Sequence, residues 1–169
     1  MAATDEKRTG MTDVYEEMCR MKILFVNGSP NKNGNTAKIA GALLKKQKFE
    51  TLNLIDYRIN AYGQTLEGDE LDHVIAQIEK ADVVVIGSPL YWHNICGSVR
   101  NMLDRFYGKV PKGGLSGKKM YFIFQGAAPE KWMLEAGEYT MQRFAGLYGL
   151  KYMGMVVNRN EAEKLSERI

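Results

Sequence analysis

Five short runs of apolar residues alternate with longer amphipathic stretches over most of the chain, and this alternation restricts the possible folds more than any other feature. The apolar runs occupy residues 22–27, 49–56, 81–89, 118–126 and 151–158. The amphipathic stretches occupy residues 36–48, 66–81, 97–106, 131–149 and 161–169. Strands that alternate with helices in this way predict a parallel sheet that is covered by helices on both faces.

The spacing of apolar residues inside the segments supports this prediction. Residues 81–89, "ADVVVIGSP", are almost continuously apolar, which is typical of a strand buried on both faces. Residues 66–81 instead repeat apolar side chains at intervals of three and four, as one buried face of a helix requires. The residues of that face are Leu71, Val74, Ile75 and Ile78. Because crossover connections are right-handed, we expect an α/β fold: a flavodoxin-like three-layer α/β/α sandwich whose five-stranded parallel sheet has the order 2-1-3-4-5.

Length and charge fit one globular domain without a strongly charged partner. The chain has 169 residues, of which 23 are basic and 20 acidic, so its net charge is +3. That charge is too small to indicate nucleic acid binding, and no apolar stretch reaches the ~20 residues that a membrane helix needs. Residues 1–20 hold five acidic and three basic side chains. We expect them to form an N-terminal extension, partly helical near 14–20, before a domain at 21–169.

The N-terminus and the cysteines indicate a reducing compartment. The first residues are charged and polar, so they do not have the apolar core of a secretory signal. The chain has two cysteines, Cys19 and Cys96, which lie far apart and form no CxxC motif. This pattern excludes a disulfide scaffold and a cysteine-rich metal site, and we expect a cytoplasmic location.

In an open parallel sheet, ligands bind beyond the carboxyl ends of the strands, near the point where the strand order reverses. The segments to consider are therefore 27–36, 87–97 and 125–131. The first, "NGSPNKNGNT", has neither the lysine and spacing of a Walker A loop nor a GxGxxG fingerprint, and it lacks the cysteine of a small phosphatase. Its neutral donors, followed at once by a helix, suit a terminal monophosphate. The alternative is a capping loop with turn-forming asparagines.

The other two segments place aromatic and small residues after buried strands. In the second segment, Tyr91 and Trp92 offer a wall for a flat aromatic ligand, or alternatively part of an interface or of the core. His93 could donate a proton there, although a lone loop histidine is more often a contact residue. The third segment, "QGAAPEK", has small residues that allow a ligand to approach the backbone closely.

The sequence shows no set of side chains that could carry catalysis alone. The only histidines are His73 and His93, and the spacing of its helix places His73 on the exposed side. Cys96 without a partner fits a small apolar filler better than a redox thiol. No spacing of metal ligands is visible. The chemistry must therefore come mostly from a bound cofactor.

Two motifs resemble the NADPH-dependent FMN reductase family of flavodoxin-like oxidoreductases. One is "ILFVNGSPNKNGNTAKIA" at 23–40, with a GSPxxxGNT-type loop after the first strand. The other is "ADVVVIGSPLYWHNICGSVRNMLDRF" at 81–106, with GSPxYW after the third strand and LDR at the end of the next helix. The alternation of strands and helices extends the resemblance from about residue 22 to 160.

The resemblance implies an FMN site and a homodimer or homotetramer with the flavin near a subunit interface. The residues implied for the FMN phosphate are Ser29, Asn31, Asn33, Gly34, Asn35 and Thr36. Those implied for the isoalloxazine ring are Pro89, Leu90, Tyr91, Trp92, His93 and Asn94 on one side and Gly126 and Ala127 on the other. Some relatives carry an iron–sulfur cysteine cluster after the second strand, but this chain has no cysteine there, so we expect no cluster and no metal.

We therefore expect an FMN-dependent NAD(P)H oxidoreductase. A hydride passes from NAD(P)H to FMN N5, and the electrons then pass to a small-molecule acceptor such as a quinone, a nitro or azo compound, or free flavin; no catalytic side chain is required. His93-Asn94 replaces the smaller residues expected after "LYW" and could alter substrate choice. The alternatives are a flavodoxin-like electron carrier that serves protein partners and a binding module without turnover. Carriers tend to be strongly acidic, so a net charge of +3 favours the enzyme.

Overall fold

The computed structural model describes residues 21–169. The partly helical stretch that we expect near 14–20 lies outside these residues. No helix within the described range is long and apolar enough to cross a membrane.

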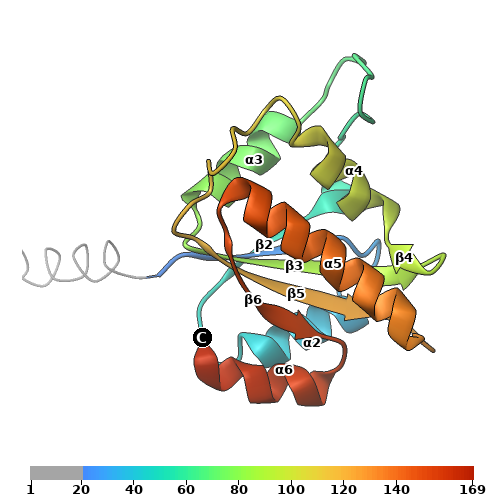
Figure 1. Cartoon of the computed structure of the whole chain (residues 1–169), viewed down its shortest axis with the longest axis vertical. Helices are drawn as coiled ribbons and strands as arrows, with labels where there is room; N and C mark the ends of the chain where they lie inside the picture. Colours follow the sequence, from blue (N-terminus) through green and yellow to red (C-terminus); the bar gives the residue numbers. More distant parts are fainter. Residues whose placement is uncertain (1–20) are drawn as a thin grey trace, which may run out of the picture.

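The described chain forms one five-stranded parallel sheet in the predicted order (Figure 1). Its strands are β1 (Ile23–Asn27), β2 (Glu50–Asn53), β3 (Val83–Tyr91), β5 (Lys119–Gln125) and β6 (Lys151–Val156). They are arranged β2-β1-β3-β5-β6, and every neighbouring pair is parallel. The flavodoxin-like order 2-1-3-4-5 is therefore confirmed, because β5 and β6 are the fourth and fifth strands of the prediction.

Helices cover both faces of the sheet, as Figure 1 shows. They are α2 (Asn35–Leu43), α3 (Leu71–Lys80), α4 (Gly97–Arg105), α5 (Lys131–Tyr148) and α6 (Arg159–Leu165). Two single turns of 3₁₀ helix follow β2 and α6, at Leu54–Asp56 and Ser166–Arg168. Helices α2 and α6 lie on one face, and α3, α4 and α5 lie on the other.

The two faces are held by two separate apolar cores, because side chains alternate along each strand. In β1, Leu24 and Val26 pack toward α3, α4 and α5, whereas Ile23 and Phe25 pack toward α2 and α6. All four side chains are buried. Burial of each such side chain contributes about 1.5–3 kcal/mol relative to exposure. Because its side chains are buried on both faces, β1 is a continuous apolar run in the sequence.

One small strand was not predicted. β3 continues two residues past the expected end and turns back into β4 (Asn94–Ile95), which pairs antiparallel with Leu90 and Tyr91. β4 projects from the sheet beside the start of α5 (Figure 1). A two-residue strand has no period in the sequence, and it forms because the preceding strand continues into a hairpin.

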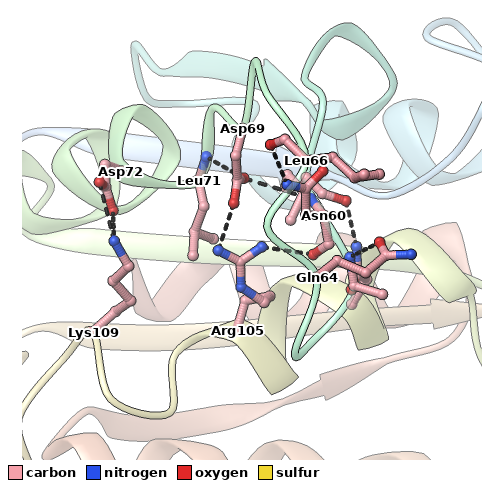
Figure 2. Close-up of polar contacts among 11 residues, drawn as sticks. Asn60, Gln64, Leu66, Asp69, Leu71, Asp72, Arg105 and Lys109 are labelled. Carbon is pink, nitrogen blue, oxygen red and sulfur yellow. Dashed lines mark hydrogen bonds and ion pairs between the residues drawn. The ribbon is translucent and has the colours of Figure 1, made fainter.

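The segment between β2 and α3 is connected to α4 by a partly buried network of polar contacts, shown in Figure 2. Arg105 at the end of α4 donates to the backbone oxygen of Asn60 at 2.7 Å and to Asp69 Oδ2 at 2.5 Å. The other carboxylate oxygen of Asp69 accepts a hydrogen bond from the backbone amide of Leu71, at the start of α3. One ion pair therefore joins the loop, the helix that follows it and a second helix.

Further hydrogen bonds give the loop its own internal order. Asn60 Nδ2 donates to the backbone oxygen of Leu66 at 2.7 Å, and Gln64 Oε1 accepts from the amide of Ala61 at 2.8 Å. Asn101 of α4 adds a second connection by donating to the backbone oxygen of Ile59. Residues 57–70 are thus fixed beside the carboxyl end of β2 by hydrogen bonds and an ion pair, with no cysteine among them.

We predict that Asp69→Asn lowers the free energy of unfolding by about 1–3 kcal/mol at pH 7, as expected for loss of hydrogen bonds to a charged group. Burial acts to raise the pKa of Asp69, but hydrogen bonds from Arg105, Leu71 and Asn60 outweigh it and hold the pKa below its ordinary value of 3.8. The ionised carboxylate therefore stabilises the fold above pH 3.8, and this contribution is lost as the pH falls through the folded-state pKa. Urea unfolding from pH 7 to pH 3 measures it.

Asp72→Asn is the matched control, because Asp72 pairs with Lys109 at 2.9 Å but its side chain is 76% exposed. Exposed pairs of this kind contribute about 0–1 kcal/mol. Equal effects of the two substitutions, or a difference between Asp69→Asn and the wild type that does not shrink at low pH, would contradict the role assigned to Asp69.

Candidate functional site

Three segments meet at the carboxyl edge of the sheet, around the β1–β3 pair where the strand order reverses. They are the loop 28–34 after β1, the end of β3 with its turn into β4, and residues 125–131 after β5. The amide of Gly28 donates to the backbone oxygen of Gly87 at 2.8 Å, which joins the first two segments. The sheet topology thus brings together the three segments that the sequence singles out.

Side chains at every second position fix the path of the loop after β1. Asn27 Oδ1 accepts from the amide of Ser29 at 3.1 Å, and Ser29 Oγ accepts from the amide of Asn31 at 3.2 Å. Asn31 Oδ1 in turn accepts from the amide of Asn33 at 3.1 Å. The turn-forming interpretation therefore holds for the oxygen atoms of Ser29 and Asn31. The hydroxyl hydrogen of Ser29 and the amide group of Asn31 are not used in these bonds.

The start of α2 offers donors and no negative charge. Gly34 is the N-cap residue and has no side chain with which to cap the helix, and the first turn has no acidic residue. The amides of Asn35, Thr36 and Ala37 have no acceptor within the helix. The side chains of Asn33 in the loop and of Asn35 at the start of α2 are exposed. This set of open amides and neutral donors fits the terminal phosphate of a nucleotide such as FMN.

Thr36 connects this helix to the third segment. Its side chain is fully buried, and Gln125 Nε2 at the end of β5 donates to Thr36 Oγ1 at 3.1 Å. Beyond Gln125, Gly126 lies so close to β3 that a Cβ atom on it would stand 3.0 Å from the Cβ of Leu90. Ala127 follows and is exposed. Residues 125–127 and the end of β3 therefore lie side by side.

Two serines that the sequence analysis did not identify help to hold the loop after β1 and the start of α4 in place. Ser98 Oγ donates to the backbone oxygen of Gly28 at 2.8 Å, and Ser88 Oγ accepts from the amide of Cys96 at 2.8 Å. Cys96 is buried, with its sulfur 3.3 Å from the Gly28 oxygen, and it packs in the core as expected. Ser98 lies in the first turn of α4, and its hydrogen-bond partner is 70 residues away in the sequence.

The turn between β3 and β4 has an unusual backbone. Trp92 and His93 are its two central residues, with φ angles of 48° and 65°. Both angles lie in the left-handed region that a type I′ hairpin turn requires, where Asn-Gly is preferred. Holding two bulky residues there costs of order 1–3 kcal/mol each. Pairing of Tyr91 with Asn94 and of Leu90 with Ile95 maintains the turn.

The side chains of this turn face outward. Trp92 is 95% exposed and Tyr91 is 49% exposed, so Trp92 is not part of the core. The ring of His93 contacts the ring of Trp132 at the start of α5, with 5.6 Å between centroids. Trp132 itself is half-exposed, and its indole N–H donates to Glu130 at 2.9 Å. Trp132 immediately follows the third segment in sequence, and a search for aromatic residues after each strand would have found it.

His73 lies apart from these segments. It is exposed on α3, as its spacing indicates, and its ring stacks on Tyr57 with 5.5 Å between centroids. Across residues 21–169, no group of three or more His, Cys, Asp or Glu side chains is arranged to hold a metal ion.

Comparison with known proteins relates the chain to flavoproteins. The family model described as NADPH-dependent FMN reductase matches residues 21–163. An iron-sulfur flavoprotein of Archaeoglobus fulgidus is 34% identical over 98 residues, which are 50% of this chain and 48% of that protein. The chain spans about half the length of the curated relatives it matches first.

Solved structures share the fold at low sequence identity. The Trp repressor binding protein from Bacillus subtilis has a TM-score of 0.69 at 18% identity, covering 85% of this chain and 98% of that one. A flavone reductase has a TM-score of 0.74 at 17% identity, covering 88% of this chain and 62% of that one. Because the family model covers most of the chain, including both motifs that meet at the β1–β3 edge, this protein belongs to the NADPH-dependent FMN reductase family.

Proposed function

We propose that this protein is an FMN-dependent NAD(P)H oxidoreductase that reduces a small acceptor. The observation that carries the proposal is that a loop rich in hydrogen-bond donors at 29–36 and an exposed aromatic turn at 91–93 both lie at the point where the strand order reverses. Membership of the FMN reductase family supports the same assignment. FMN supplies the chemistry when bound, since its ring accepts a hydride from NAD(P)H and gives two electrons to a quinone, a nitro or azo compound, or free flavin.

In this proposal the chain binds and aligns the reactants. The first-turn amides of α2, with Ser29, Asn31, Asn33, Asn35 and Thr36, hold the phosphate of FMN. The backbone from Pro89 to Asn94 lies along one side of the ring, and Gly126 and Ala127 approach it from the other. The close approach of Gly126 to Leu90 holds these two segments side by side, so both are available at the same edge of the sheet to border the ring. Alignment of two rings can supply about 7 kcal/mol or more of the rate enhancement.

We predict that Ser29→Ala combined with Thr36→Ala raises the dissociation constant for FMN by about tenfold or more, because two hydroxyl donors to a charged phosphate are lost. Titration of the apoprotein, with quenching of FMN fluorescence, measures the affinity. Ser116→Ala is the control, since Ser116 precedes β5 at the opposite edge of the sheet. Unchanged FMN affinity in the double variant, with the fold intact by circular dichroism, would show that the phosphate binds elsewhere.

We further predict that NADH or NADPH bleaches the flavin absorbance of the FMN-loaded protein near 450 nm within seconds in the absence of oxygen. A panel of a quinone, a nitroarene, an azo dye and free flavin then identifies the acceptor by turnover. A flavin that stays oxidised with both nucleotides, yet takes electrons from a reductase protein, would favour the electron carrier over the enzyme. Protein that takes up no FMN would overturn both.

We also propose a homodimer or homotetramer, as the family resemblance implies. Tyr107 of the loop after α4 and Tyr139 of α5 are 60% and 63% exposed, and Arg100 and Arg143 lie in the same groove between α4 and α5. Exposed tyrosine and arginine side chains are enriched at protein interfaces, which supports this surface as the contact. The small net charge and the few cysteines support a cytoplasmic protein without a nucleic acid partner.

A further inference from the structure

A groove of about 530 Å³ lies at the amino edge of the sheet, opposite the edge that carries the candidate site. The start of β1, the start of β2 and the end of α3 border it, on the left in Figure 1. Its apolar lining residues are Met21, Ile23, Leu24, Phe49 and Ala81. We refer to this hollow as the amino-edge groove.

Part of the apolar lining remains open to solvent. Phe49 directly precedes β2 and is 37% exposed, and Gln77 on the α3 side of the groove is half-buried. β2 is the edge strand of the sheet, so within residues 21–169 no further strand covers this side. A large apolar side chain in an open hollow is surface that another element can bury. The amino-edge groove is therefore a candidate docking surface.

The groove also carries an excess of positive charge. Lys22, Lys48 and Lys80 line it and are exposed, whereas Glu50 is the one acidic residue among the described residues that line it. None of the ion pairs formed within residues 21–169 includes one of these three lysines. Long lysine side chains at the border of an apolar hollow can reach carboxylates of an element that lies in it. The charge of the groove therefore favours an acidic occupant.

The sequence that directly precedes Met21 has the complementary pattern. Apolar residues recur there at intervals of three and four, as on one face of a helix. They are Met11, Val14, Tyr15 and Met18. The acidic residues of the same stretch fall on the other sides of such a helix, because their positions are out of phase with the apolar ones. They are Asp13, Glu16 and Glu17. This stretch combines an apolar face with negative charge, as the amino-edge groove requires.

We propose that residues 11–20 form an amphipathic helix that docks in the amino-edge groove of the same chain. Its apolar face covers Phe49, and its acidic side chains approach the lysines that line the groove. Met21 both follows this segment and lines the groove, so the segment is tethered where it binds, at an effective concentration on the order of millimolar. A helix of this length is marginal in water, so the groove supplies the packing that it needs. The inference does not depend on the proposed function, because the groove lies at the opposite edge of the sheet.

The first test is hydrogen–deuterium exchange of the full chain, followed by mass spectrometry of the peptides that cover residues 11–20. We expect their amides to exchange at least about tenfold more slowly than those of a synthetic peptide with the same sequence. Phe49→Asp should remove this protection. Ile55→Asp is the matched control and should keep it, because Ile55 is 54% exposed and lies beyond the other end of β2.

A segment that exchanges as fast as the free peptide in wild type would overturn the proposal, and so would protection that persists in Phe49→Asp. Lys48→Glu combined with Lys80→Glu gives a second variant, whose changes lie on exposed side chains and leave the core intact. We expect it to lower the protection at least about threefold, since like charges then face each other. Unchanged protection in this variant would contradict the charge contacts. FMN affinity should stay as in wild type in all of these variants.

The second test asks which face of the segment meets the groove, and in which chain. Val14→Cys combined with Gln77→Cys, with Cys19→Ser to remove the neighbouring thiol, should form a disulfide within one chain under mild oxidation. Asp13→Cys in place of Val14→Cys is the control and should react at least about tenfold more slowly, because it lies on the opposite face. Cys96 is buried and stays out of the reaction.

Non-reducing electrophoresis separates the products of this oxidation. Equal rates for the two cysteine positions would show that no single face docks, and would overturn the proposal. A disulfide that joins two chains would assign the segment to the groove of a second copy, which contradicts docking within one chain. Protein that takes up no FMN would overturn the proposed function alone, because neither the exchange nor the disulfide experiment requires the flavin.

Discussion

The contact on which the site depends is the hydrogen bond from Gly28 to Gly87, which closes the gap between β1 and β3 where the strand order reverses. Neither position has room for a side chain. A Cβ on Gly28 would stand 2.3 Å from Val99 of α4, and a Cβ on Gly87 would stand 2.6 Å from Thr36 of α2. Two glycines thus let helices from opposite faces of the sheet approach the same pair of strands. The loop 28–34 and the β3–β4 turn therefore lie at the same edge of the sheet.

Most of the fold was predictable from the sequence because the central strands β1, β3 and β5 are buried on both faces. The first four residues of β3, for example, are all apolar, and such a run is visible without any knowledge of its neighbours. β4 was not predictable, because two residues have no periodicity and the hairpin depends on the preceding strand. The ion pair of Arg105 with Asp69 also escaped prediction, since its partners lie 36 residues apart and both read as ordinary surface charges.

The site was predictable at the level of segments and less so at the level of atoms. The sequence identified the loop at 27–36, but an asparagine both donates and accepts, so its pattern cannot say which group faces a ligand. In the structure the side-chain oxygens of Asn27, Ser29 and Asn31 hold the loop. The hydroxyl hydrogen of Ser29 and the amide group of Asn31 are left for a bound anion, whereas Asn27 Nδ2 donates to Asn53 Oδ1. Trp132 was missed because the third segment considered ends at residue 131, whereas Trp132 lies in the first turn of the helix that follows it.

The segments that border the site are stabilised in opposite ways, and the difference carries information about function. Residues 57–70 are held by an ion pair and hydrogen bonds to α3 and α4, so every contact there favours the folded loop. The β3–β4 turn instead holds Trp92 and His93 at unfavourable φ angles and leaves Trp92 in solvent. The polar groups of residues 57–70 thus add to the stability of the fold, whereas the strain in the β3–β4 turn adds nothing to it. The surrounding fold, through the pairing of β3 with β4, compensates the cost of this turn, and strain that adds nothing to stability at this edge of the sheet points to a role in binding.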